Sequence, residues 1–195
     1  MEAEPPGTPE GARTASIVIG MFEGVHKARR ALLAQAKQKA SATGAPLAAP
    51  PSEPPPRELF RPDEPPCRIT PQALKAERLE QAGVEFLFSR TFDWSFASLS
   101  AEDFIEKILK VEFGAAQIIV GFDFHFGQMR RGTAQMIGQA GIPVTVIEEI
   151  KGKDGQEISS SRIRQYLRRG EIEKANALLG WEWEIRGEIV RGDQR

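Results

Sequence analysis

Short hydrophobic runs alternate with longer amphipathic segments along most of this chain. The runs predict buried strands at residues 15–20, 45–49, 84–88, 116–121 and 142–147. Hydrophobic positions with helical spacing and helix-capping residues predict helices at residues 31–42, 70–83, 100–109, 133–140, 160–169 and 171–179, with Thr70 as the N-cap of the second. Strands that are hydrophobic on both faces and separated by helices indicate a parallel sheet covered on both sides. We therefore expect an α/β fold with a Rossmann-like, doubly wound parallel sheet, in which ligands bind beyond the carboxyl ends of the strands.

A run of prolines interrupts the second predicted strand. Five of them follow residue 49 within seven positions: Pro50, Pro51, Pro54, Pro55 and Pro56. Proline has no N–H group to donate to a sheet ladder, so this strand must end at about Ala49. A polyproline-like connector is the favoured interpretation of the run, and a functional loop is the alternative.

The size and charge of the chain limit the classes of function. Its 195 residues suit one α/β domain, and 41% hydrophobic and 27% charged residues are typical of a globular protein. The net charge of −1 provides no overall field that would attract nucleic acid or an anionic membrane, so neither is an expected partner. The single cysteine, Cys67, excludes an intramolecular disulfide and a multi-cysteine zinc site. The oligomeric state is left open.

The first residues of the chain predict no targeting segment. Residues 1–14 are rich in proline, glycine and glutamate and are expected to be disordered. They lack the apolar core of a signal peptide, and no apolar run in the chain has the length of a membrane span. We therefore expect a cytoplasmic protein.

The first strand leads into a turn that suits a phosphate. Residues 17–30 read IVIGMFEGVHKARR, a strand followed by glycines and a basic helix start. Free backbone N–H groups, the positive end of the helix dipole and the cations Lys27, Arg29 and Arg30 can all meet an anion here. From the pattern alone, His26 is better explained as an ordinary residue at a helix start.

Three consecutive hydroxyl side chains begin a later predicted helix. Ser159, Ser160 and Ser161 precede Arg162 and Arg164. Such hydroxyls can cap the helix and can also donate to phosphate oxygens, with the arginines one turn away. Composition alone leaves N-capping and phosphate binding equally open.

A third segment combines aromatic and polar residues after a hydrophobic strand. Residues 121–127 read GFDFHFG, with three phenylalanines alternating with polar residues between two glycines. As a bare pattern, this segment suits a strand edge with one packed face.

Together the three segments resemble the adenylyltransferase module of prokaryotic FAD synthetases, the bifunctional riboflavin kinase/FMN adenylyltransferases. They are similar to the family segments G-N-F-D-G-V-H-x-G-H, I-S-S-T-x-I-R and V-G-x-D-F-x-F-G. Residues 57–63, 96–105 and 178–180 extend the likeness. The resemblance implies a fold of the nucleotidylyltransferase type over residues 15–181. Residues 182–195 resemble the first strand of the riboflavin kinase module, so no riboflavin kinase activity is expected from this chain.

The resemblance also implies an activity. The family module transfers AMP from ATP to FMN, giving FAD and pyrophosphate in FAD biosynthesis. ATP and FMN are then the substrates, and Mg²⁺ is bound through their phosphates rather than by a dedicated cluster of protein ligands.

Residue roles follow from matching the motifs position by position. The resemblance implies catalytic roles on the triphosphate for His26, Ser159 and Arg164. It implies nucleotide contacts for Phe22, Gly24, Arg29, Ser160, Ser161 and Arg162. It implies flavin contacts for Asp123, Phe124, His125, Phe126 and Arg130.

Four positions depart from the family pattern. The family has an asparagine at the position of Met21 and a glycine at that of Ala28. It has histidines at the positions of Arg29 and Pro55. Arginine supplies charge and donors with a geometry unlike that of imidazole, whereas proline supplies no side-chain donor. Two hypotheses follow: an FMN adenylyltransferase with impaired turnover, or a catalytically inactive pseudoenzyme that binds flavin or nucleotide. A nicotinamide-nucleotide or pantetheine-phosphate adenylyltransferase is a weaker third, because the phenylalanine-rich segment argues against it.

Overall fold

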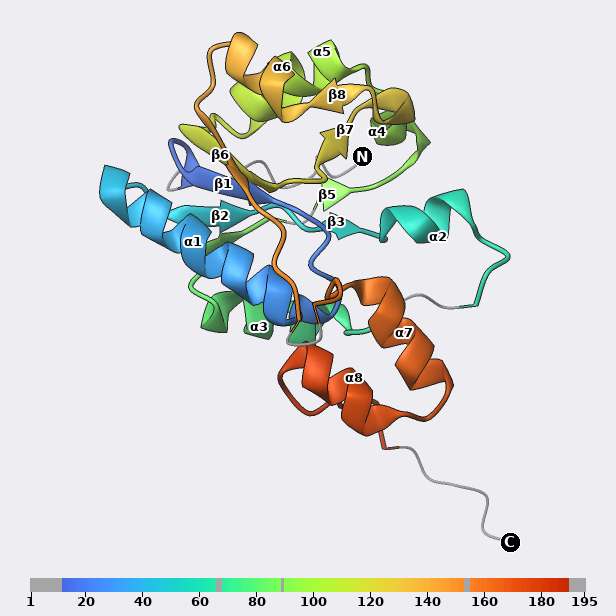
Figure 1. Cartoon of the computed structure of the whole chain (residues 1–195). Helices are drawn as coiled ribbons and strands as arrows, with labels where there is room; N and C mark the ends of the chain where they lie inside the picture. The colour runs from blue at the N-terminus through green and yellow to red at the C-terminus, as the bar shows by residue number, and fades with distance from the viewer. Residues whose placement is uncertain (1–11, 66–67, 89, 153–154, 190–195) are drawn as a thin grey trace, which may run out of the picture.

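A parallel five-stranded sheet lies at the centre of the computed structural model, which describes residues 12–65, 68–88, 90–152 and 155–189 (Figure 1). Its strand order is β4-β2-β1-β6-β9. These strands are β1 (Ser16–Ile19), β2 (Leu47–Ala49), β4 (Phe86–Leu87), β6 (Gln117–Gly121) and β9 (Val144–Ile147). Each lies within one of the predicted strand segments. The chain winds outward from β1 in both directions, which confirms the doubly wound α/β fold.

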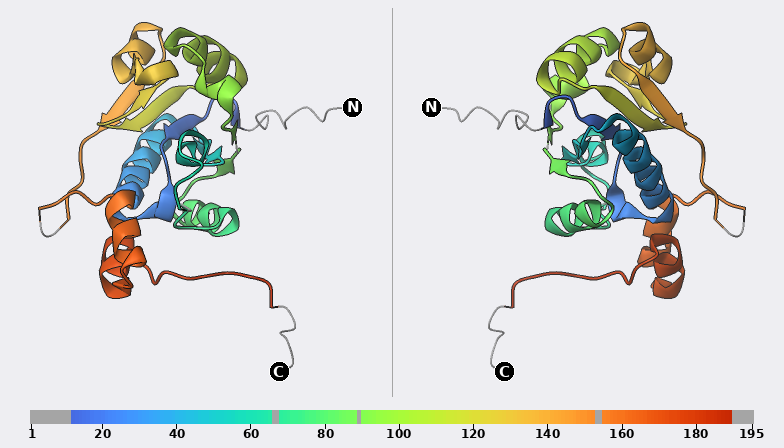
Figure 2. Two further views of the ribbon diagram at one scale, coloured as in Figure 1. Left: turned by 90° about the vertical axis from the view of Figure 1, so that its right-hand side faces the viewer. Right: turned by 90° about the vertical axis from the view of Figure 1, so that its left-hand side faces the viewer.

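Helices cover both faces of this sheet (Figures 1 and 2). The helices α1 (Lys27–Thr43) and α3 (Gln72–Gln81) lie on one face. On the other face are α5 (Ala101–Asp103), the π-helical segment η3 (Phe104–Glu112) and α6 (Ala134–Gln139). Because side chains alternate across a strand, Ile17 packs under η3 while Val18 packs under α1. The sheet thus separates two hydrophobic cores.

A helical pair stands beside the start of α1. The pair consists of α7 (Ser160–Arg168) and α8 (Ile172–Leu179), whose buried residues Ile163, Ala175 and Leu179 pack with Ile69 (Figure 1). The remaining short elements are η2 (Glu23–Val25), β3 (Ser52–Glu53), α2 (Pro56–Phe60), β5 (Arg90–Thr91), α4 (Trp94–Ala97), β7 (His125–Phe126), η4 (Gln128–Arg130) and β8 (Gly132–Thr133).

The proline run forms more structure than the connector that the sequence suggests. The strand β2 does end at Ala49, as predicted. Beyond it, however, β3 pairs in parallel with β5, and Pro56 begins α2. A proline fits the first turn of a helix because the N–H groups there have no partner within the helix. Pro50, Pro51, Pro54 and Pro55 lie between these elements, so the connector interpretation is wrong only for Ser52, Glu53 and Pro56.

Residues 12–14, which the sequence predicts to be disordered, are part of the folded domain. Ala12 is fully buried, and the Thr14 N–H donates to the Gly114 carbonyl at 3.0 Å, so residues 12–14 belong to the domain. Residues 1–11 and Cys67 lie outside the described residues. Residues 182–189 form neither helix nor strand, and residues 190–195 are not described, so the assignment of this segment to a kinase module stays a prediction. Among the described helices, none has the length and hydropathy needed to cross a membrane.

Candidate active site

The turn after β1 lies where the sheet order reverses direction. Between β1 and α1 the chain passes through η2, in which Gly24 has a φ of +76° and Val25 a φ of +36°. His26 follows as the N-cap residue of α1. A turn at the carboxyl end of β1, next to a helix N-terminus, is the expected place for a phosphate in a doubly wound sheet.

The imidazole of His26 is buried and electrically neutral. His26 is 2% exposed, and its Nδ1 has no hydrogen-bond partner in the part of the chain that the structure describes. Burial, followed by the positive charges of Arg29 and Arg164, lowers the pKa of His26 to about 3. Near neutral pH this side chain therefore offers a hydrogen-bond donor and an acceptor, and carries no charge.

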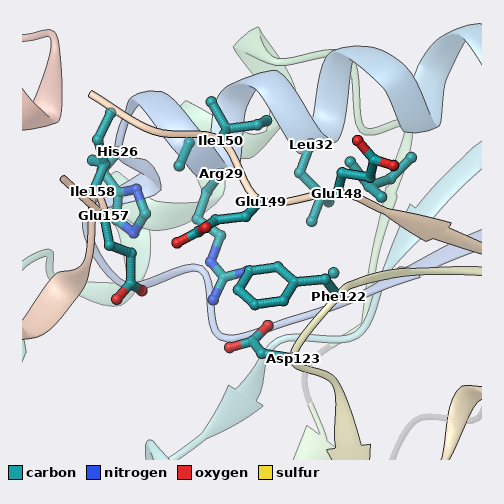
Figure 3. A pocket seen from close by; sticks show the side chains of 13 residues that line it. His26, Arg29, Leu32, Phe122, Asp123, Glu148, Glu149, Ile150, Glu157 and Ile158 are labelled. Atoms are coloured by element: carbon teal, nitrogen blue, oxygen red, sulfur yellow. The ribbon is translucent and has the colours of Figure 1, made fainter. Parts of the chain in front are cut away.

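A cavity opens beside His26 at the carboxyl ends of β6 and β9. It has about 410 Å³ of empty space, partly open to solvent, and its lining includes His26, Arg29, Asp123, Glu157 and Ile158 (Figure 3). The Arg29 guanidinium points into the cavity, and its buried Nε has no partner among the described residues. Buried polar atoms in proteins are normally hydrogen-bonded, so this cavity is suited to a ligand rich in acceptors.

Carboxylates face the same cavity. Asp123, Glu149 and Glu157 are drawn around the Arg29 guanidinium in Figure 3, and Glu148 also lines the wall. Within the described ranges, no three His, Cys, Asp or Glu side chains are grouped so that they could hold a metal ion by themselves. A cation here would need ligands from a bound molecule in addition to these carboxylates.

The three predicted serines have different positions. Ser159 is the N-cap of α7, and its Oγ accepts from the Arg162 N–H at 3.4 Å, as plain capping predicts. The Ser160 hydroxyl donates to the Glu23 carbonyl at 3.1 Å and so joins α7 to the turn after β1. Ser161 is exposed. Ser160 is therefore the serine with a direct bond to the turn that precedes His26.

Arg162 and Arg164, in the first turns of α7, have different neighbours near the cavity. Arg162 donates to the Glu157 carbonyl and to the Tyr166 hydroxyl, at 3.4 and 3.3 Å. Glu157 belongs to the cavity wall, so Arg162 supports that wall. Arg164 is half-buried and close enough to His26 to lower its pKa.

The predicted flavin residues divide between the surface and the core. Asp123 lines the cavity, and its carbonyl meets the His125 ring at 3.0 Å and accepts from Arg130 at 3.4 Å. Phe124 stacks on Phe126, with ring centroids 5.5 Å apart. Phe126 itself is 7% exposed and belongs to the hydrophobic core. It is therefore placed to support Phe124 and not to offer a surface.

A second, smaller cavity lies on the other side of the same turn. It is lined by Gly20, Met21, Phe22, Glu23, Pro51, Ser52, Pro55 and Lys75. Phe22 is 2% exposed and packs into the core beside this cavity, away from the lining of the first one. The four departures from the family pattern thus separate into two pairs. Ala28 and Arg29 line the first cavity, whereas Met21 and Pro55 line the second.

Three aromatic residues form a surface that the sequence did not predict. The Phe60 ring lies 5.8 Å from Phe92 and 5.6 Å from Trp94, and Phe60 and Trp94 are 54% and 63% exposed. Further ring contacts continue inward from Phe92 through Phe96, Phe104 and Phe126 to Phe124. The three rings of the surface, Phe60, Phe92 and Trp94, come from α2, the residue after β5 and α4. No regular spacing along the chain could therefore have identified them as one surface.

Known proteins support the likeness seen in the motifs. A family model for FAD synthetase matches residues 8–162. The bifunctional riboflavin kinase/FMN adenylyltransferase of Bacillus subtilis is 36% identical over 92% of this chain and 57% of its own length. The protein of the same name from Escherichia coli K12 is 34% identical over 91% of this chain and 58% of its own length. The chain therefore spans less than two thirds of these relatives.

A solved structure has the same fold over nearly the whole chain. A macrolide-efflux protein from Streptococcus pneumoniae superposes with a TM-score of 0.83 at 30% identity, over 96% of this chain and 62% of its own. The fold, the three motifs at one sheet edge and the family match agree with one another. This chain belongs to the FAD synthetase family.

Proposed function

We propose that this chain is an FMN adenylyltransferase, which transfers AMP from ATP to FMN and releases pyrophosphate. The observation that carries the proposal is a pair of buried nitrogen atoms, His26 Nδ1 and Arg29 Nε, that have no partner among the described residues. Both belong to side chains lining one cavity at the N-terminus of α1. The phosphate oxygens of ATP would supply the missing acceptors, with the helix dipole aligned to favour them.

The reaction needs positioning more than acid–base chemistry. An oxygen of the FMN phosphate forms a bond to the α-phosphorus of ATP, and the bond from that phosphorus to the bridging oxygen breaks. Pyrophosphate then leaves with the bonding electrons. Neutral His26 is suited to donate an N–H to a phosphate oxygen, while Arg29 and Arg164 supply positive charge. The bond between Ser160 and Glu23 keeps the start of α7 against this turn.

Magnesium fits this arrangement as a partner of the substrate. Mg²⁺ usually keeps one or two carboxylate ligands and takes the rest from phosphates and water. The carboxylates of Asp123, Glu149 and Glu157 face the cavity and could supply the one or two protein ligands. When bound, the ion would neutralise negative charge on the triphosphate.

The exposed rings provide a place for the flavin. A flat isoalloxazine ring gains most from stacking on aromatic side chains, and Phe60 and Trp94 present such faces to solvent. Their ring contacts run back to Phe124, which connects the aromatic surface to the segment that resembles the family's flavin loop. We include Phe60, Phe92 and Trp94 in the proposed flavin site for this reason.

Binding without turnover is the second candidate function. Met21 and Pro55 give the second cavity no side-chain hydrogen-bond donor at the two positions where the family has asparagine and histidine. Losing one preorganised donor costs on the order of 10²–10³ in rate, and several losses in one site do not simply multiply. A pseudoenzyme would keep the first cavity and the rings but lose catalysis.

A turnover assay combined with a binding measurement separates the two candidates. The purified chain is mixed with FMN, ATP and Mg²⁺, and FAD is followed by chromatography against a control without ATP. FAD that forms only with ATP supports the adenylyltransferase. Calorimetric binding of FMN or ATP without FAD supports the pseudoenzyme, and the absence of both turnover and binding contradicts both candidates. A cytoplasmic location stays a prediction from the sequence.

A further inference from the structure

We propose that Trp181, in the segment after α8, is a positioning residue for His26. The role of His26 at the triphosphate rests on the proposed function. The structural argument concerns how the turn before His26 keeps its shape, and it can be tested without any turnover.

The turn before His26 has an unfavourable backbone conformation. Val25 has a φ of +36° and is fully buried, although left-handed conformations are rare for β-branched residues. Gly24, just before it, has a φ of +76°. Strained residues of this kind persist only where the surroundings hold them in place. His26 follows directly, so the direction of its imidazole depends on those surroundings.

Both polar backbone groups of Gly24 are held by side chains from distant parts of the chain. The Gly24 N–H donates to the Thr70 hydroxyl at 3.3 Å. The Trp181 indole N–H donates to the Gly24 carbonyl at 3.1 Å. The expected role of Thr70 as the cap of α3 is therefore wrong, because its buried hydroxyl serves the turn and Pro71 occupies the cap position.

The segment carrying Trp181 is itself firmly attached. The Arg78 guanidinium lies 4.6 Å from the centre of the Trp181 ring. Arg30, from the first turns of α1, donates to the carbonyls of Leu179 and Gly180, each at 3.2 Å. Gly180 has a φ of +76°, and a Cβ at this position would collide with Arg30. The end of α8 is thus fastened to the same helix that His26 begins.

The side chain of Trp183 provides an internal comparison. Its indole N–H donates to the Ile69 carbonyl at 2.9 Å, so it attaches the same segment to the domain by the same kind of bond. Unlike Trp181, it contacts no backbone group of the turn by a hydrogen bond that the structure records. Trp181→Phe and Trp183→Phe each remove one indole N–H and keep an aromatic ring. Their difference therefore compares a direct bond to the backbone of the turn with a bond that reaches the turn only through Ile69.

The histidine content of the chain makes a direct readout possible. The sequence has two histidines, His26 and the exposed His125, so two sets of imidazole NMR signals are expected. In the unaltered protein, burial and the charges of Arg29 and Arg164 keep His26 neutral between pH 7 and 5. In Trp181→Phe the loosened turn admits water, and we expect His26 to titrate within this range. Trp183→Phe should leave its signals unchanged.

Activity gives a second readout where FAD is formed. Loss of one positioning hydrogen bond should lower kcat roughly tenfold in Trp181→Phe, because the groups that stabilise the transition state are misaligned. The KM for FMN should not change. Trp183→Phe should keep kcat within about twofold of the unaltered protein.

Each outcome decides the proposal. Titration of His26 in Trp181→Phe alone supports it, and equal His26 signals in the two variants overturn it. If the unaltered protein makes no FAD, the function fails while the NMR comparison still tests the positioning role. If Trp181→Phe does not fold, 3-benzothienylalanine introduced at position 181 removes the N–H and keeps the ring size. An unchanged His26 signal in that protein would also overturn the proposal.

Discussion

The ammonium group of Lys75 lies 2.5 Å from one carboxylate oxygen of Glu23, and both side chains are almost completely buried. The same ammonium lies 2.7 Å from Glu53, so it bridges two carboxylates. Glu23 belongs to the turn after β1 and Glu53 to β3, so Lys75 joins loops that follow neighbouring strands. The second oxygen of Glu23 accepts from the Ile69 N–H at 3.1 Å. The Lys75–Glu23 ion pair thus forms part of the wall of the second cavity.

Lys75→Met should destabilise the protein strongly. Removing one partner of a buried ion pair leaves uncompensated charge, which typically costs about 3–5 kcal/mol of unfolding free energy. Urea denaturation of the variant measures this loss. Lys107→Met is the matched control, since the Lys107 side chain is 64% exposed and should change stability by less than about 0.5 kcal/mol. Adding Glu23→Gln to Lys75→Met should recover part of the loss, and no recovery would contradict the pairing.

The buried imidazole of His26 makes stability depend on pH. In the unfolded chain a histidine has a pKa of about 6.5, whereas the folded protein lowers the pKa of His26 to about 3. Between these values the unfolded state binds more protons, so stability is fully present above pH 6.5 and falls as the pH decreases toward 3. The slope for one such group approaches about 1.4 kcal/mol per pH unit.

Urea denaturation at several pH values between 7 and 4.5 measures how the free energy of unfolding depends on pH. His26→Gln should remove most of the slope that is due to the histidine, whereas His125→Gln should leave it, since His125 is exposed. If the unfolding free energy of His26→Gln falls equally steeply as the pH decreases, the pH dependence is due to other groups.

The sequence predicted the central sheet because local patterns determine it. The hydrophobic runs that become β1 and β6 are continuous, and only Thr145 interrupts the run of β9. Two of the motifs bring His26, Arg29 and Asp123 to one cavity, because parallel strands end at the same side of the sheet. Even the shortened β2 follows from the missing N–H groups of the prolines.

Contacts between distant segments could not be predicted in this way. Thr70 looked like a helix cap, since its bond to Gly24 bridges 46 positions and leaves no local signal. The resemblance implied a flavin contact for Phe126, yet its ring packs against Phe104 as part of the core. The buried charges of Glu23 and Lys75 would be read as exposed from composition alone. In each case tertiary packing decided the position of a residue whose type suited several environments.

The aromatic surface predicts a selective effect on flavin binding. Phe60→Ser should weaken FMN binding roughly tenfold, since stacking of aromatic rings contributes about 0.5–1.5 kcal/mol beyond buried area. ATP binding should remain the same, because Phe60 lies outside the cavity that holds His26 and Arg29. Fluorescence titration of FMN and calorimetry with ATP measure the two affinities. Val111→Ser is the control, as Val111 is 75% exposed and belongs to η3. Equal weakening of both ligands would contradict a flavin site at Phe60.

Arg29 provides the sharpest test of whether the altered motif still serves ATP. Arg29→Met keeps a side chain of similar length and removes the guanidinium, which points into the cavity. If Arg29 binds phosphate, ATP affinity should fall roughly tenfold or more, because charge-assisted hydrogen bonds are about twice as strong as neutral ones. Arg169→Met, at the exposed end of α7, should leave ATP affinity unchanged. Tighter ATP binding in Arg29→Met would mean that the guanidinium obstructs the cavity, and it would favour the interpretation of this chain as a pseudoenzyme.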